Sequence, residues 1–158
     1  NRGLDVGGQS IGSPTRFHIG VAVNPFAVSG DAEWRRLEYK VEAGAEFLMT
    51  PPILDLGAFD AAAARLRASG LPIVAGVVAL DSVRQAEFLA SEVAGLQMPE
   101  RVLERLRSAD DQVAEGLAIT REIVDGLRSR VDGIHVTGLH GSATVVQRLL
   151  ECLGVFHK

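Results

Sequence analysis

The sequence contains one cysteine, Cys152, and no run of arginine or lysine residues. A single cysteine excludes an internal disulfide framework and is typical of a reducing compartment, so we expect a cytoplasmic protein. Its position in an apolar helical stretch predicts a small, packed side chain. The formal net charge of −4 leaves no general basic surface for nucleic acid. We therefore expect no nucleic-acid partner.

Long apolar runs are also absent. None approaches the ~20 residues that a membrane-spanning helix needs, and the opening "NRGLDVGG" does not resemble a signal peptide. We therefore expect no membrane association. The sequence begins at Asn1 without a methionine, which suggests a fragment or a processed product. The histidines and carboxylates show no metal-ligand spacing, so we expect no metal site.

Strands and helices are predicted to alternate along the chain, whose 158 residues fit one domain. Apolar, β-branched stretches predict strands at residues 15–23, 46–50, 71–78 and 131–139. Amphipathic stretches predict helices at residues 31–44, 57–70, 82–93, 98–109, 111–130 and 142–154. This order indicates a parallel α/β protein with its functional loops at one rim of the sheet. Because the strands are uniformly apolar, we expect both faces of the sheet to be covered.

The second predicted strand runs into "TPPILD". Proline donates no ladder hydrogen bond and pushes the preceding residue out of the helical region, so we expect the strand to stop at Thr50 and a stiff loop to follow. Asp55 either belongs to a site in this loop or caps the helix from Leu56 onward. The cap is the favoured interpretation.

Four βα units are half of a closed (β/α)₈ barrel, whose typical length is ~250 residues. An isolated half barrel has two exposed sheet edges, which invite pairing with another chain or with a missing half. We therefore expect a homo-oligomer or a partner that supplies the rest of the barrel. A flavodoxin-like open sheet is the competing architecture, but "NPFAVSGD" is not the phosphate-binding first turn of that fold.

Several segments resemble the second half of methylenetetrahydrofolate reductases: "NRGLDVGGQSIGSPTRFHIGVAVNP", "RLEYKVEAGAEFLMTPPILD", "PIVAGVVALDSVRQAEFLASEVAGLQMPERVLERL" and "GIHV". The resemblance is collinear over nearly the whole chain. It is closest to the reductase modules of bifunctional homocysteine S-methyltransferase/methylenetetrahydrofolate reductases. It implies that residues 1–158 are the C-terminal half of a (β/α)₈ TIM-barrel domain and supply about the last four βα units.

This resemblance implies flavin-dependent reduction of 5,10-methylenetetrahydrofolate to 5-methyltetrahydrofolate, with FAD as the cofactor and NAD(P)H as the reductant. The family's catalytic glutamate and its flavin-tuning aspartate end the first and fourth strands, which are not in this chain. We therefore expect activity only with the N-terminal half of the barrel, and we assign no catalytic residue here. A non-catalytic reductase-like subunit or interaction domain, and another enzyme on the same scaffold, remain alternatives.

Carried over by position, the resemblance places five residues near the flavin: Ala22, Asn24, Glu33, Arg36 and Lys40. Asn24 would offer its amide to the flavin ring or the ribityl chain, or it is only a turn residue at the strand end. The spacing of Glu33, Arg36 and Lys40 puts them on one helical face. The same spacing is typical of a solvated amphipathic helix.

The resemblance places the substrate contacts of this chain at Thr50 and Pro51. The family commonly has a glutamine where this chain has Pro51, so one polar partner for the ligand ring is lost. Gly141 stands where some reductases have an arginine, and the adjacent His140 would carry a positive charge in slightly acid solution. We expect His135, inside "GIHV", to be a packed strand residue rather than a base.

Overall fold

A computed structural model describes residues 3–93, 95–139 and 143–155. The strands of this part of the chain form one parallel sheet, and its strand order follows the sequence: β1 Gly20–Ala22, β2 Phe47–Pro52, β3 Ile73–Val78 and β4 Gly133–Thr137. A flavodoxin-like sheet has its first strand between the second and third. The observed order is that of consecutive units of a (β/α)₈ barrel, so the α/β half-barrel prediction is confirmed.

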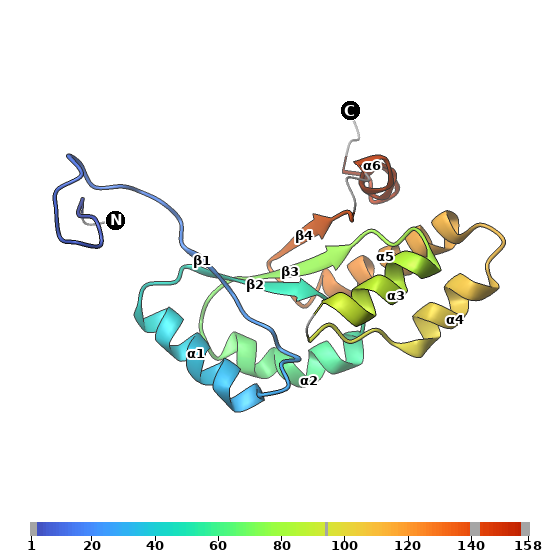
Figure 1. Ribbon diagram of the computed structural model, residues 1–158, viewed down its shortest axis with the longest axis horizontal. Helices are drawn as coiled ribbons and strands as arrows, with labels where there is room; N and C mark the ends of the chain where they lie inside the picture. The colour runs from blue at the N-terminus through green and yellow to red at the C-terminus, as the bar shows by residue number, and fades with distance from the viewer. Residues whose placement is uncertain (1–2, 94, 140–142, 156–158) are drawn as a thin grey trace.

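The helices pack on one face of this sheet (Figure 1): α1 Gly30–Glu42, α2 Leu56–Arg67, α3 Val83–Glu92, α4 Glu100–Ser108, α5 Gln112–Leu127 and α6 Ala143–Cys152. Their apolar stripes bury against every second residue of the strands. In α1, Trp34 and Leu37 enter the same buried cluster as Leu48 of β2. In α6, Val145 and Leu149 pack with Ala79.

The opposite face of the sheet is open in the described part of the chain. Register pairs Met49 with Val74 and Gly76 with His135, so these residues point away from the helices. Met49 and Val74 are only half-buried, and His135 is exposed. The expectation that both faces are covered is therefore wrong for this chain. In a closed barrel this open face would be the interior, and further strands would cover it.

Strand β2 does not stop at Thr50. It continues through Pro51 and Pro52, and the register with β3 shifts between Met49 and Pro52. The hydroxyl of Thr50 accepts a hydrogen bond from the Gly76 N–H at 3.0 Å, where a strand residue would usually offer a carbonyl. The prolines are tolerated because pairing with β1 ends at Met49, and the irregular register removes the need for their missing N–H groups.

Strand β1 is shorter than the predicted residues 15–23. Residues 3–19 extend away from the helices and the sheet (Figure 1). Their local structure is a loop in which the Asp5 carboxylate accepts hydrogen bonds from the Gly7 and Gln9 N–H groups. At the start of β1, the Ile19 N–H donates to the carboxylate of Glu46 instead of a strand carbonyl. Regular pairing therefore begins only at Gly20.

Two further side-chain predictions have clear outcomes. Asp55 caps α2, because its carboxylate accepts from the Ala58 N–H at 3.0 Å. Cys152, expected to be packed, is exposed. The buried stripe of α6 continues from Leu149 to Leu153, and Cys152 lies beside that stripe at the end of the helix. Among the described residues, no helix is long and apolar enough to cross a membrane.

Candidate functional site

The open face of the sheet contains a hollow of about 680 Å³. Its floor is apolar and includes Met49, Pro51 and Gly76 from the two central strands. Polar side chains reach it from α1 and from β4. The residues that line it are Gly20, Val21, Ala22, Val23, Asn24, Glu33, Lys40, Met49, Thr50, Pro51, Pro52, Gly76, His135 and Thr137. A hollow of this size, apolar with a few polar groups, suits a planar ligand.

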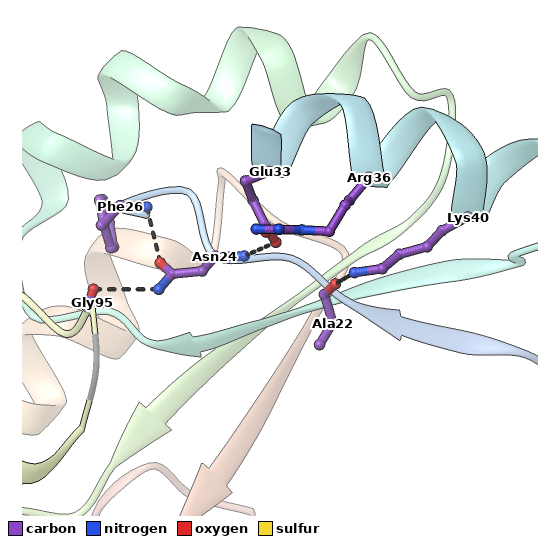
Figure 2. Close-up of polar contacts among 7 residues, drawn as sticks. All are labelled: Ala22, Asn24, Phe26, Glu33, Arg36, Lys40 and Gly95. Atoms are coloured by element: carbon purple, nitrogen blue, oxygen red, sulfur yellow. Dashed lines mark hydrogen bonds and ion pairs between the residues drawn. The ribbon is translucent and has the colours of Figure 1, made fainter. Parts of the chain in front are cut away.

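Lys40 lies at the edge of this hollow, in the last turn of α1. Its Nζ donates a hydrogen bond of 2.6 Å to the carbonyl oxygen of Ala22 at the end of β1 (Figure 2). An ammonium group has three donors, so two remain for another partner. This arrangement positions a positive charge beside the hollow and at the same time ties α1 to β1.

Glu33 is buried at the other end of the same helical face, and both of its carboxylate oxygens are hydrogen-bonded within the chain. Its Oε1 accepts from the Asn24 N–H at 2.9 Å, and its Oε2 accepts from the guanidinium of Arg36 at 2.6 Å (Figure 2). Burial raises the pKa of Glu33, but the hydrogen bonds from Asn24 and Arg36 and the charges of Lys40 and Arg36 together lower it below its usual value. Glu33 is therefore an ionised group that holds the chain after β1.

Asn24 connects three segments of the chain at the end of β1. Its backbone N–H donates to Glu33, its Oδ1 accepts from the Phe26 N–H at 2.9 Å, and its Nδ2 lies 3.5 Å from the carbonyl oxygen of Gly95 (Figure 2). The last contact joins the β1 end to the connection between α3 and α4. The turn function of Asn24 is thus visible in the structure, and its amide is already engaged.

Thr50 and Pro51 contribute differently to the hollow. The Thr50 hydroxyl accepts from the Gly76 N–H and donates to the Pro51 carbonyl, so it holds the irregular strand in place. Pro51 adds an apolar surface to the floor and offers no side-chain hydrogen bond. The Thr50 hydroxyl replaces a strand carbonyl as the acceptor for the Gly76 N–H because the register shifts at this point. The sequence pattern does not predict that shift.

The family resemblance placed seven residues of this chain near the cofactor or the substrate. Six of them line the hollow: Ala22, Asn24, Glu33, Lys40, Thr50 and Pro51. Arg36 does not line it, because its guanidinium turns to Glu33. Gly141 and His140 lie outside the described residues. Within the described ranges no group of three or more histidine, cysteine or carboxylate side chains is placed to hold a metal ion.

His135 is the lining residue that sequence reasoning misplaced. We expected it to be packed inside its strand, but it is exposed on the open face beside Gly76. Strand alternation gives the physical reason, because Ile134 and Val136 point towards the helices and His135 must point the other way. The alternating pattern of "GIHVT" is consistent with this orientation. His135 was expected to be packed because both faces of the sheet were expected to be covered.

Comparison with known proteins agrees with this architecture. The protein-family model described as methylenetetrahydrofolate reductase matches residues 12–154. A search of the curated proteins finds no significant match. A similar solved structure is described as an uncharacterized protein from Clostridium thermocellum that binds two copies of 5-methyl-5,6,7,8-tetrahydrofolic acid.

That structure matches with a TM-score of 0.64 and 14% sequence identity, over 84% of this chain and 50% of its own chain. At this identity the likeness shows the fold alone, and the present chain spans about half the length of that structure. The family match is the stronger finding, because it covers both the strands and the loops that form the hollow. The chain belongs to the methylenetetrahydrofolate reductase family.

Proposed function

We propose that this chain is the C-terminal half of a barrel that reduces 5,10-methylenetetrahydrofolate to 5-methyltetrahydrofolate with FAD, using NAD(P)H as the reductant. The observation that carries the proposal is the convergence of Ala22, Asn24, Glu33, Lys40, Thr50 and Pro51 on one hollow at the open face. Family membership of residues 12–154 supports the same chemistry.

The residues of the hollow fit FAD in two respects. Its volume of about 680 Å³ and apolar floor are suited to an aromatic ring system, and Lys40 has ammonium donors to spare for a phosphate group. In this proposal the flavin would supply hydride transfer when bound. Lys40 would bind the polar tail, while Glu33 and Asn24 would hold the end of β1 against the cofactor.

The Glu33–Arg36 pair refines the assignment of cofactor residues. The guanidinium of Arg36 is committed to Glu33 at 2.6 Å, and Glu33 in turn holds the Asn24 N–H. Both side chains therefore act in the proposal by positioning the β1 end, and Lys40 is the direct contact. Ala22 would contribute through its backbone carbonyl, which already fixes Lys40.

The substrate contacts in the proposal are Thr50 and Pro51. Thr50 would shape the floor by holding β2 against β3 through Gly76. Pro51 would contact the folate ring by packing alone, because proline has no polar side-chain atom and no N–H. The open face also explains why this half would need its partner: further strands must cover it to close the ring and exclude water from the ligand.

A non-catalytic, reductase-like subunit is the second candidate. It is favoured by one observation, the floor formed by Met49, Pro51 and Gly76, which offers no side-chain amide to a folate ring. A subunit of this kind would shape the site of a partner chain. It would bind the complementary half as tightly as a catalytic half does, and it would lack turnover.

The deciding experiment is reconstitution of the complete barrel from this chain and the N-terminal half of a reductase of the same family. The proposal predicts a flavin-coloured complex that oxidises NAD(P)H only when 5,10-methylenetetrahydrofolate is added. A folded complex that retains flavin but has no folate-dependent turnover would favour the non-catalytic subunit. A folded complex that retains neither flavin nor folate would contradict both candidates.

A further inference from the structure

Most polar side chains at the hollow are already hydrogen-bonded within the chain. Thr50 is paired with Gly76, and Glu33 with Asn24 and Arg36. The Thr137 hydroxyl donates to the carbonyl oxygen of Val77 at 3.3 Å. Groups that are satisfied in this way have little capacity left for a ligand.

Lys40 keeps two free donors, and His135 differs from the other polar lining residues because its side chain is not hydrogen-bonded within the described chain. Its imidazole is exposed, and it makes no hydrogen bond or ion pair with any described residue. An imidazole that carries one proton both donates and accepts a hydrogen bond. His135 therefore presents a complete and unused pair of polar atoms to the space above the sheet.

The sheet register sets the distance from this imidazole to the proline platform. His135 pairs with Gly76, and Gly76 pairs with Pro52 on the next strand. Neighbouring strands are ~4.8 Å apart, so the backbones of His135 and Pro52 are about 10 Å apart across the floor. Between them, the Thr50 and Pro51 backbone lies over Gly76, within 2.5–2.9 Å of where its Cβ would be. The prolines therefore face His135 across the hollow, which forms a slot with an apolar side at the prolines and a polar side at His135.

We propose that His135 binds the polar edge of a planar heteroaromatic ring seated in this slot, with the ring face over Met49 and Pro51. The matching ligand edge carries an adjacent carbonyl and N–H, as a pterin or an isoalloxazine does, because such an edge both accepts and donates. This inference rests on the proposed function and deepens it, since it assigns a ligand contact on β4 where none was expected.

The test is an NMR titration of this chain, isotope-labelled and reconstituted with the N-terminal half of a reductase of the same family, with 5-methyltetrahydrofolate and, separately, with FAD. The imidazole resonances report on His135, and the Met49 methyl reports independently on occupancy of the floor. We expect the His135 and Met49 signals to shift together and saturably with at least one ligand. The signal of His18, an exposed histidine near Glu46 and outside the hollow, should stay unchanged. The ligand that shifts them identifies whether the slot takes the pterin or the flavin.

Three variants separate hydrogen bonding from shape. His135→Phe keeps a ring but removes both nitrogens, and should weaken binding about three- to tenfold, as expected for one lost hydrogen bond. His135→Gln restores a donor and an acceptor and should recover most of that loss. His18→Phe is the matched control and should leave the affinity unchanged. Because His135 is exposed, these changes should not disturb folding.

The outcomes distinguish this inference from the proposed function. If Met49 shifts while His135 does not, or if His135→Phe binds as tightly as the parent chain, the slot binds ligand without His135 and the inference is overturned. If neither residue of a folded, reconstituted complex responds to either ligand, the result counts against the inference and against the proposed function together.

Discussion

Lys40 shows how a single side chain links local structure to the proposed cofactor site. Its helical spacing from Glu33 alone predicts only a charged face, and the structure adds the 2.6 Å hydrogen bond to the Ala22 carbonyl. That bond fixes the ammonium beside the hollow. Two donors of that ammonium remain, and in the proposed function they would bind a phosphate group.

We predict that Lys40→Ala in the complete barrel weakens FAD binding by about 10- to 150-fold, because a hydrogen bond to a charged group contributes about 1.5–3 kcal/mol. Flavin retention is measured by equilibrium dialysis. Arg35→Ala is the matched control, since Arg35 is an exposed cation on the same helix and does not line the hollow. Equal flavin affinity in both variants would dismiss Lys40 as a cofactor contact.

Glu33 gives a prediction about the pH dependence of stability. Its pKa is lowered in the folded chain, so its ionised form stabilises the fold above the unfolded-state pKa, and this contribution is lost as the pH falls through the folded-state value. We expect Glu33→Gln to lower the free energy of unfolding by about 1–2 kcal/mol at neutral pH, for loss of charged hydrogen bonds in a buried place.

The difference between Glu33→Gln and the parent chain should shrink steadily below about pH 4.3, the unfolded-state pKa of glutamate, and vanish once Glu33 is protonated. Urea unfolding at a series of pH values measures it. Glu38→Gln is the control, because Glu38 lies on the exposed side of α1. A difference that stays constant down to pH 2 would show that the Glu33 charge does not stabilise the fold.

The sequence predicted residue positions better than residue roles. Positions could be carried over from the family resemblance, which implied that Ala22, Asn24 and Lys40 lie near one another. Roles depend on which partner each polar atom finds. The pairing of Arg36 with Glu33, and of the Asn24 amide with Phe26 and Gly95, is a tertiary outcome with no signature in spacing.

In β2, pairing with the neighbouring strand outweighs the tendency of proline to end a strand. The two prolines predicted a strand end, and the strand instead continues to Pro52. The rule that proline ends a ladder assumes that each N–H is needed, and the shifted register removes that need. In compensation, the Gly76 N–H donates a hydrogen bond to the Thr50 hydroxyl.

This arrangement requires a glycine at position 76. A Cβ there would lie 2.5 Å from the Thr50 carbonyl oxygen and 2.8 Å from the Pro51 carbonyl carbon, both of them backbone atoms. We predict that Gly76→Ala lowers the free energy of unfolding by about 1–3 kcal/mol, as overpacking against a rigid backbone does. Urea denaturation measures the change.

Gly133→Ala is the matched control for this prediction. Gly133 is also a strand glycine, but a Cβ there would make an ordinary contact of 3.5 Å with a methyl group of Val74. Its substitution should change the free energy of unfolding by less than about 0.5 kcal/mol. If both variants unfold at the same urea concentration, β2 does not press on Gly76 as the structure indicates.

At the scale of the whole molecule, strand order and parallel pairing were predicted correctly because alternating βα units leave few other topologies. The covering of the sheet was predicted wrongly. Apolar strands indicate burial on both faces of the final assembly, whereas the helices of this chain account for only one face (Figure 1). The apolar pattern is therefore the one that strands of a closed barrel would have, whereas the described part of this chain covers one face of its sheet.

The open face leads to a prediction about the isolated chain. A ligand in the hollow would lie on Met49 and Pro51 with its other face in water, so only part of its apolar surface would be buried, and affinity follows the buried, water-excluded contacts. We expect the 158-residue chain alone to bind FAD weakly or not at all. Addition of the N-terminal half should raise the affinity by at least a hundredfold, because it encloses the second face of the ring.

Equilibrium dialysis with the flavin absorbance as the readout tests this directly. The chain is measured alone, with the N-terminal half, and with the same half added to the Lys40→Ala variant, which should recover only part of the affinity. A tight, yellow one-to-one complex of FAD with the isolated chain would contradict the prediction. It would mean that the residues of this half, chiefly Lys40 and the floor of the hollow, already enclose the cofactor, and that a second half barrel is not needed for binding.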